Sequence, residues 1–427
     1  MQVFCLISHS PTRKHTVAQV YTYSRIVLRM EKKSTRLYFI DAIRTWAILM
    51  MLQGHFIDGL LDNAFRDNTD LGFSIWKYFR GITAPVFFTV SGFIFTYLLI
   101  RSPEKGFENP RVKKGIKRGL ELLLIGYLLR IDLFGILNGE IYPSFYLVDV
   151  LHCIGLSILG IIAIYLLTQA KKKFVFPTVL VSVTFLLFLF EPQYHLWSYS
   201  FLPDALANYV TKTNGSIFTI FPWFGHASFG AFASIMFMRY KDSRHLYSMA
   251  ITISLVVGSL LIFFSSDLFL ALSRLTGIQL FADIFFNNYL FTRLGDVLLV
   301  FMVFMLFRKF MTNLTLLKVG QSTLSIYIVH FIILYGSFTG LGLYQFFSHS
   351  LSPIVVISGA IAFMIVCSYF ALLYEKHKIE IKGNIAKMFK QLRSKAEPWQ
   401  NFAFKLLKAT FTKTKLLLLK LLGLVKN

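Results

Sequence analysis

The chain has 427 residues, of which 56% are hydrophobic and 15% charged, and its mean hydropathy is +0.61. This composition is typical of a polytopic membrane protein and excludes an ordinary soluble domain. The net charge of +23 does not indicate a nucleic-acid partner, because most of the excess lies at the two ends and in short loops between apolar segments.

The N-terminal segment, residues 1–38, carries seven Lys or Arg against one acidic residue, and we predict that it is cytosolic. No apolar run precedes Arg36, so a signal peptide is not expected. Met30, directly before Glu31, is a second candidate start, in which case residues 1–29 would not be native.

Ten apolar segments follow, several of them near the ~20 residues that a helix needs to cross a bilayer. They are residues 39–57, 78–100, 118–137, 147–168, 174–190, 217–238, 247–264, 289–307, 322–340 and 352–374. The pattern predicts an all-α fold, a polytopic bundle of about ten transmembrane helices that occupies residues 39–374.

The loops between these segments alternate in charge. Every second loop is basic, beginning with the N-terminus and including 101–117 and 171–173, whereas the others are neutral or acidic. The positive-inside rule then places both termini in the cytosol of a multi-pass protein, which we expect in a bacterial cytoplasmic (inner) membrane. Residues 375–427 carry thirteen Lys or Arg against three acidic residues, interleaved with leucines, which predicts a basic amphipathic helix on the inner leaflet.

The first apolar segment contains three ionisable residues on one stripe. Arg44 and His55 are eleven residues apart, which places them within roughly 20° of each other and ~16 Å apart along a helix. Asp41 falls within roughly 40° of the same face. Charged groups in hydrocarbon are costly unless they face a bundle interior or a wet cavity. We therefore favour a site over the alternative, in which Asp41 only pairs with Arg44 and His55 only bonds a backbone carbonyl.

Further polar residues lie near the predicted outer ends of other segments: Asp149 and His152, His226, and Arg293 and Asp296. The spacing of three in each pair puts both side chains on one helix face. A carboxylate beside an imidazole orients it and raises its basicity. A purely structural pairing is an equal alternative for Arg293 and Asp296, and for His330, mid-segment, the structural role is favoured.

The cysteines Cys5, Cys153 and Cys367 form no CxxC motif and no regular spacing with histidine. Neither a metal site nor a disulfide framework is therefore predicted.

Five motifs, in this order, resemble the heparan-alpha-glucosaminide N-acetyltransferase-like family of membrane acyltransferases, which is related to the acyltransferase-three type. They are residues 40–44 (IDAIR) with His55, 84–92 (APVFFTVSG), 148–155 (VDVLHCIG), 221–225 (FPWFG) and 320–330 (GQSTLSIYIVH). The resemblance covers roughly residues 36–375. One departure is Thr45, where family members usually have glycine after the arginine, and the substrate of the lysosomal enzyme is not carried over.

The resemblance implies acyl transfer from cytosolic acyl-coenzyme A (acetyl-coenzyme A), a co-substrate rather than a bound cofactor. The acceptor would be an amine or hydroxyl of a sugar or glycoconjugate on the outer side. His55 is predicted as general base or acyl acceptor, with Asp149 and His152 to orient it or complete proton transfer. Arg44 and the basic loops would attract the phosphates of coenzyme A. The remaining predicted substrate-binding residues are Asp41, His226, Arg293 and Asp296.

The expected partners are the lipid bilayer, acyl-coenzyme A and the acceptor, and a homodimer is left open. Two other classes are weighed against the acyltransferase: a proton-coupled secondary transporter or exporter, because buried Asp, Arg and His also build proton relays, and a scaffold whose polar residues lock helix packing. Transporters often have two related halves, and no such similarity occurs here. Dependence on a coenzyme A thioester separates the enzyme from the transporter.

Overall fold

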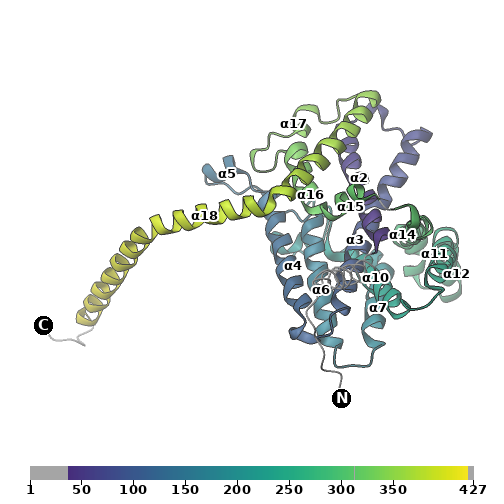
Figure 1. Ribbon diagram of the computed structural model, residues 1–427, viewed down its shortest axis with the longest axis horizontal. Coiled ribbons are helices and arrows are strands. Elements are labelled where there is room, and N and C mark those ends of the chain that lie inside the picture. Colours follow the sequence, from purple (N-terminus) through teal and green to yellow (C-terminus); the bar gives the residue numbers. More distant parts are fainter. Residues whose placement is uncertain (1–36, 312, 422–427) are drawn as a thin grey trace, which may run out of the picture. The chain divides into compact units, whose positions relative to one another are not determined.

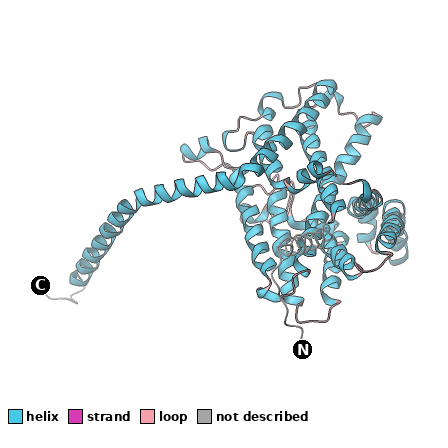
Figure 2. Ribbon diagram, viewed as in Figure 1, coloured by secondary structure: helices cyan, strands magenta, loops and turns pink. Residues whose placement is uncertain are grey.

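A computed structural model describes residues 37–311 and 313–421. Within these residues the regular elements are helices, apart from one isolated bridge between Leu61 and Leu351. Figures 1 and 2 show the helices that precede residue 353 packed side by side. The predicted all-α class is thus confirmed. The basic segment predicted for residues 1–38, with the alternative start at Met30, lies almost wholly outside the described residues.

Each of the ten predicted apolar segments overlaps a helix of at least 13 residues. These are α2 (Tyr38–Leu60), α3 (Leu71–Ile100), α4 (Pro110–Leu129), α6 (Val150–Thr168), α7 (Val175–Leu189), α10 (Ile220–Arg239), α11 (Leu246–Phe263), α14 (Tyr289–Leu306), α16 (Thr323–Tyr335) and α18 (Pro353–Leu421). Between them lie the shorter helices α5 (Leu133–Leu137), α8 (Glu191–Tyr194), α9 (Asp204–Ala207), α12 (Ser265–Thr276), α13 (Gln279–Phe286), α15 (Leu314–Gln321) and α17 (Leu343–Phe347).

Six helical stretches are long and apolar enough to cross a bilayer, and the pair α15–α16, bent by 70°, raises the number to seven. The six are Leu71–Ile100, Pro143–Thr168, Ile220–Arg239, Leu246–Phe263, Tyr289–Leu306 and Pro353–Met388. The chain is accordingly a multi-pass integral membrane protein. The predicted total of ten spans is not confirmed, because α2 carries Asp41, Arg44, His55 and Asp58, α4 begins with several cations and α7 has only 15 residues.

The third predicted segment, residues 118–137, differs from the helix that forms there. Asn109 caps α4 by accepting from the backbone N–H of Arg111 at 2.9 Å, with Pro110 in the first position. The helix ends at Leu129, and Asp132 then caps the separate helix α5 by accepting from Phe134 N at 2.9 Å. Polar caps set these ends, whereas hydropathy located only the apolar middle.

Helix α3 packs against α2, α6, α10 and α14 and so lies at the centre of the bundle. Its crossing with α10 is very close. A β-carbon on Gly92 would lie 1.9 Å from the Ala227 carbonyl oxygen, and one on Gly230 would lie 1.8 Å from that of Thr89. Small residues at both positions let the two backbones touch, as is typical of membrane helix pairs.

Helix α2 is held against α15 by a similar approach. The Thr45 hydroxyl donates to the Leu316 carbonyl at 2.7 Å, and a β-carbon on Gly320 would lie 2.2 Å from the carbonyl oxygen of Asp41. Thr45, the departure from the family pattern, therefore bonds the helix that leads into α16. This contact fixes the Arg44 end of α2.

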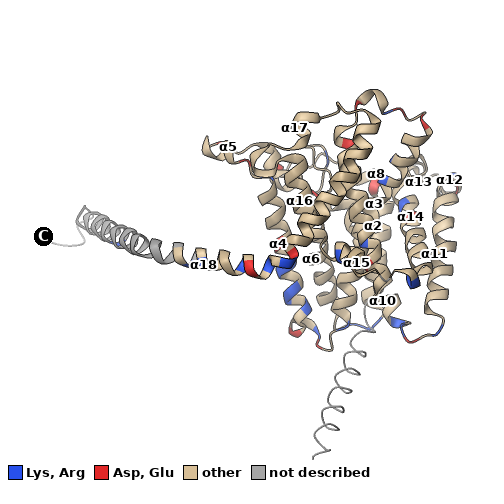
Figure 3. Cartoon of the chain, turned by 45° about the horizontal axis from the view of Figure 1, so that its top comes forward, with Lys and Arg blue, Asp and Glu red and all other residues tan. Residues whose placement is uncertain are grey.

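Helix ends that were predicted to share a membrane side lie together. The Leu60 carbonyl accepts from the backbone N–H groups of Ser350 and Leu351 at 3.1 and 2.9 Å, and Asn109 donates to the Leu99 carbonyl at 3.0 Å. Figure 3 shows Lys and Arg gathered on the first turns of α4 and in the loop after α10. These contacts fit the predicted alternation of the helices, but the alternation itself and the assignment of one end to the cytosol stay predictions.

The chain divides into two compact units, one ending at Ile365 and the other beginning at Val366. The boundary falls inside α18, which runs without a break from Pro353 to Leu421. The predicted tail, residues 375–427, is thus helical as far as Leu421, and its amphipathic contact with the inner leaflet stays a prediction.

Candidate active site

His55 lies in the last turns of α2 and faces α16. Its Nδ1 is 3.0 Å from the hydroxyl oxygen of Tyr335, and its ring centroid is 5.4 Å from that of His330. His55 is partly exposed, whereas His330 is buried. A hydroxyl at Nδ1 orients the imidazole and leaves Nε2 as the nitrogen that a reactant can approach. His55 was predicted from the sequence as a site residue and His330 as a structural one, whereas Tyr335 was not singled out.

One turn beyond His55, the carboxylate of Asp58 is engaged by two arginines. Arg80 approaches Asp58 Oδ2 at 2.5 Å and Arg66 approaches Oδ1 at 3.4 Å. Arg66 also donates to the Asp58 backbone carbonyl. These contacts fix the end of α2 that carries His55. Asp58, three residues after His55, is close enough in sequence to pair with its imidazole, but its carboxylate pairs with these arginines.

At the other end of α2, Arg44 joins α16 as well. Its Nη2 donates to the Thr323 hydroxyl at 3.1 Å, and its Nη1 lies 3.8 Å from the Asp41 carboxylate. The Arg44 side chain is 23% exposed, so part of the guanidinium remains accessible. Both ends of the predicted stripe therefore face the same neighbouring helix, as the spacing of eleven residues requires.

A cavity of about 290 Å³ begins at Arg44. Its wall comes from α2, α3, α4, α6 and α16, and its polar side chains are Arg44, Ser91, Arg118, Thr323 and Tyr327. Apolar residues such as Ala47, Leu122 and Ile154 make up the remainder. Arg118, which the sequence analysis assigned only to the start of a span, thus places a second guanidinium on this wall, beside Glu121 at 3.9 Å.

Tyr327 connects this cavity to the two histidines. It lines the cavity, and its ring centroid lies 4.7 Å from that of His330, which in turn contacts His55. The described residues therefore form a continuous series from two guanidinium groups, through an apolar cavity, to a pair of imidazoles. Hydropathy could not have located Tyr327, because in sequence it is one aromatic residue among many in an apolar helix.

Asp149 and His152 come together at the start of α6. The Asp149 carboxylate accepts from Leu151 N at 3.0 Å and lies 3.1 Å from His152 Nδ1, which closes a capping box with the Asp149 backbone. Arg130 approaches the same carboxylate at 3.4 Å. His152 is completely buried, with its ring 4.5 Å from that of Tyr127. No hydrogen bond among the described residues joins this group to His55, and its catalytic role stays a prediction.

His226 lies inside α10, completely buried between aromatic rings. Its centroid is 4.8 Å from that of Phe188 and 5.9 Å from that of Trp223. Within the described part of the chain, neither ring nitrogen has a hydrogen-bond partner. This setting is one of apolar packing, and substrate binding by His226 remains untested.

Arg293 and Asp296 form a compact group with α3. Arg293 pairs with Asp296 at 2.8 Å, the Tyr78 hydroxyl donates to the same carboxylate at 2.6 Å, and the guanidinium stacks over the Tyr78 ring at 4.7 Å. The guanidinium also lies against Gly81. Pro85, four residues later in α3, has no backbone N–H to donate to the Gly81 carbonyl. The group ties α14 to α3, which favours the structural alternative for this pair.

A further polar group organises the loop that leads into α10. Glu191 is buried, 3.4 Å from the Tyr289 hydroxyl and 3.7 Å from His195 Nδ1. Burial lowers the pKa of Lys212 nearby, and the Glu191 carboxylate opposes that shift. Across residues 37–311 and 313–421, no group of three or more His, Cys, Asp or Glu is arranged to hold a metal ion.

The comparison with protein families gives one match. The family described as heparan-alpha-glucosaminide N-acetyltransferase, catalytic, matches residues 36–270, more than half of the chain. No curated protein matches the chain. The matched region contains Arg44, His55 and Arg118 but ends before α14 and α16, so the helix that supplies Tyr327, His330 and Tyr335 lies beyond it.

Proposed function

The chain belongs to the heparan-alpha-glucosaminide N-acetyltransferase family, and from this premise we propose that it is a membrane acetyltransferase that uses acetyl-coenzyme A. The acceptor is an amine or hydroxyl of a sugar or glycoconjugate on the opposite side of the membrane. The observation that carries the proposal is the series from Arg44 and Arg118, along the cavity, to His330 and His55.

The arginine end of this series matches the phosphates of acetyl-coenzyme A, and the histidine end matches its thioester. Coenzyme A carries phosphates, and guanidinium groups bind phosphate oxygens through paired, charge-assisted hydrogen bonds. Arg44 and Arg118 lie at the end of the bundle that the loop charges assign to the cytosol. The apolar wall between them and Tyr327 accepts the uncharged pantetheine arm, with the thioester directed toward the histidines.

His55 is the residue that we assign to the chemical step. In direct transfer, the acceptor nitrogen or oxygen attacks the thioester carbonyl, His55 Nε2 takes the acceptor proton, and the coenzyme A thiolate leaves. In the two-step route, Nε2 itself attacks the carbonyl and the thiolate leaves. The acceptor then attacks the acyl carbon, the bond from this carbon to Nε2 breaks, and the acceptor's proton passes to the departing thiolate or to the released imidazole. Either route needs an unprotonated Nε2, which follows when Nδ1–H donates to Tyr335.

The test is acetyl transfer by the purified full chain in detergent, with radiolabelled acetyl-coenzyme A and a panel of amino sugars and neutral sugars. We expect His55→Ala to lose activity by about 10²–10⁴-fold, the usual contribution of a general base. The control is His377→Ala, which removes a half-exposed histidine of the second unit whose Nδ1 lies 3.5 Å from the Glu380 carboxylate.

Full activity of His55→Ala would refute the role of this residue. Absence of thioester binding and turnover by folded wild-type protein would refute the acetyltransferase itself. In that case, proton-driven flux of a solute without any thioester would support the transporter.

A further inference from the structure

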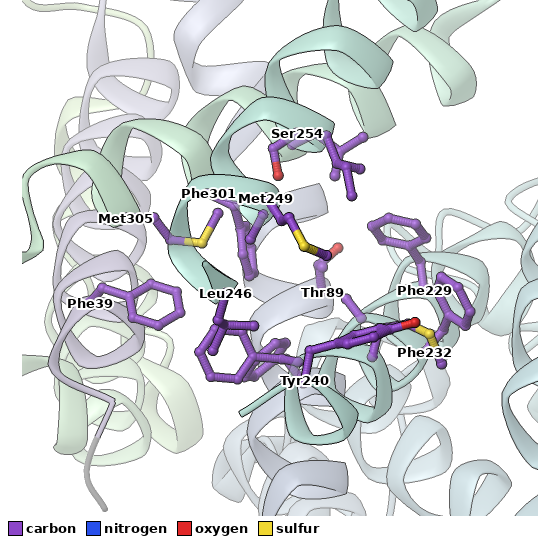
Figure 4. Close-up of a pocket in the computed structure, with 17 residues that line it drawn as sticks. Phe39, Thr89, Phe229, Phe232, Tyr240, Leu246, Met249, Ser254, Phe301 and Met305 are labelled. Atoms are coloured by element: carbon purple, nitrogen blue, oxygen red, sulfur yellow. The ribbon is translucent and has the colours of Figure 1, made fainter. Parts of the chain in front are cut away.

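A second cavity, separate from the candidate active site, lies between α10 and α11. Its volume is about 320 Å³, and Figure 4 shows that the side chains surround an open centre. Of the 17 residues that line it, only Thr89, Tyr240 and Ser254 carry a polar group, and each of these is a hydroxyl. None of the predicted site residues takes part. The chemistry of the wall is therefore that of a hydrocarbon chain.

The cavity exists because two consecutive helices pack on different partners. Helix α10 packs on α3 and α7, whereas α11 packs on α14. Phe39 of α2, Phe93 of α3 and Phe301 of α14 also line the space between them. On α11, Met249 and Ile253 line the cavity and are also 41% and 55% exposed. The cavity is thus a groove that opens sideways into the surroundings of a membrane helix, where lipid chains lie.

The length of the groove matches the thickness of the hydrocarbon layer of one leaflet. Along α10 it runs from Tyr240 to Phe229, eleven residues or about 16 Å, and along α11 from Leu246 to Ser254, eight residues or about 12 Å. Half of a hydrocarbon core of about 30 Å is about 15 Å. The groove therefore begins at one membrane surface and ends near the midplane, which is the depth of a single acyl chain.

The open end of the groove is basic. Helix α10 ends with Arg239, and the loop to α11 contains Lys241 and Arg244 against Asp242. The residues after α14 add Arg308 and Lys309. Arg308 is held in place, because it stacks on the Tyr247 ring at 4.1 Å and donates to the carbonyl of Met305, a wall residue, at 2.8 Å. The loop charges assign this end to the cytosol, where the leaflet carries anionic lipids.

We propose that this groove binds one anionic phospholipid of the inner leaflet, with an acyl chain along the α10–α11 wall and the phosphate beside Arg308. The occupant is a bilayer lipid and not the acyl donor, since the donor's proposed cavity lies on the other side of α3 among α2, α4, α6 and α16. The acyl chain would then pack against the side of α11 that faces α10, where α11 has no extensive contact with another described helix.

The test is native mass spectrometry of the full chain in detergent, delipidated and then incubated with dioleoylphosphatidylglycerol or dioleoylphosphatidylcholine. The two lipids have identical chains and differ in headgroup charge. We expect one tightly held phosphatidylglycerol per chain and at least about fivefold less phosphatidylcholine, since one basic residue near a membrane surface contributes about that factor. Arg308→Gln should reduce the preference about fivefold without changing the binding of phosphatidylcholine.

Two variants fill the groove from different helices, Ala233→Phe on α10 and Ala250→Phe on α11. Each should abolish the tightly held lipid. The matched control, Val257→Phe, enlarges a residue of α11 that is 40% exposed and lies outside the groove. Size-exclusion chromatography checks folding, and two independent filling variants keep the test decisive should one of them fail to fold.

The proposal is overturned if either folded filling variant keeps the tightly held lipid, or if the two lipids bind equally to wild-type protein. Displacement of the lipid by palmitoyl-coenzyme A, but not by coenzyme A, would overturn it too and assign the groove to a long-chain donor. None of these outcomes depends on acetyl transfer, so the lipid site and the proposed function fail independently.

Discussion

At the scale of single residues, the candidate site depends on His55 and on the hydroxyl that holds it. Tyr335 comes from a helix more than 270 positions later in the chain, and its oxygen is 3.0 Å from His55 Nδ1. When the Tyr335 hydroxyl accepts from Nδ1–H, Nε2 carries no proton and can accept one, and the proposed reaction uses this tautomer. Tyr335 is thus a positioning residue for the proposed reaction.

Tyr335→Phe removes this hydroxyl while keeping the ring. We expect kcat to fall about fivefold, because one hydrogen bond contributes about 1 kcal/mol net, with little change in the KM of the donor. Steady-state kinetics across pH measures both quantities. The control Tyr344→Phe changes a neighbouring ring, 5.9 Å from Tyr335, and should leave kcat unchanged. Equal kcat in wild type and Tyr335→Phe would argue against the assigned role.

Arg118 and Lys117 provide a matched pair for the donor end of the site. Both are cations on α4 and both lie 3.9 Å from Glu121, but only Arg118 lines the cavity. Arg118→Gln should raise the KM for acetyl-coenzyme A about fivefold, a modest value because the side chain is 45% exposed and screened by solvent. Lys117→Gln should leave the KM unchanged. An equal effect of the two substitutions would indicate a general charge effect and not a donor contact.

At the scale of elements, polar side chains decide how helices α3 and α14 meet. Arg293, Asp296 and Tyr78 satisfy one another across this contact. Removing one member of a buried ion pair leaves the other charge without compensation, whereas replacing both by apolar residues of similar size is often neutral.

Asp296→Ala should therefore lower the free energy of unfolding by about 3–5 kcal/mol. The double variant Arg293→Met with Asp296→Leu should recover most of that loss. Thermal denaturation in detergent compares them, and the donor KM is measured at a temperature where all remain folded. If this group only joins helices, the KM stays at the wild-type value. A large rise in KM in the stable double variant would restore the substrate-binding prediction for these two residues.

The bend between α15 and α16 is a second feature of this scale. The predicted span over residues 322–340 begins at this bend, because the helix breaks at Ser322 and α15 meets α16 at 70°. The sequence did not predict the helix α15 that precedes the break. The break brings Thr323 within 3.1 Å of Arg44 and lets α15 pack on α2 through Gly320 and Thr45. Irregular backbone at membrane depth is tolerated where protein or a cavity surrounds it, and here the cavity lies directly beside it.

At the scale of the whole molecule, the orientation in the membrane gives the proposed site its direction. The loop charges predict that the Arg44 end lies in the cytosol and the His55 end outside. Loop 61–70 joins α2 to α3, and loop 101–109 joins α3 to α4. The two loops therefore lie at opposite ends of α3, where a labelling reagent can test each of them separately.

Cysteine labelling checks this orientation. In a chain whose three cysteines are replaced by serine, Asn68→Cys should react with a membrane-impermeant maleimide on intact cells, because it lies on the predicted outer side. Lys105→Cys should react only after permeabilisation. The reverse pattern would invert the topology and place the guanidinium groups outside, away from cytosolic coenzyme A.

The sequence by itself determined the class of protein, the family and the approximate positions of the apolar helices, and it named Arg44 and His55 as candidate site residues. These follow from local properties: long apolar runs specify helices in a membrane, because every backbone group must be satisfied within its own segment, and a spacing of eleven fixes a helix face. The ends of the helices were less predictable, since caps such as Asn109 and Asp132 override hydropathy.

Only the tertiary structure decided which polar residues meet. It joined His55 to Tyr335 and His330, placed Tyr327 and Arg118 on one cavity wall, and separated Asp149, His226 and Arg293 into groups with their own partners. The physical reason is that a helical pattern specifies which face of a helix is polar but not which other helix that face contacts. That choice is made by close packing at a few positions, such as Gly92, Gly230 and Gly320, whose meaning is visible only when both helices are present.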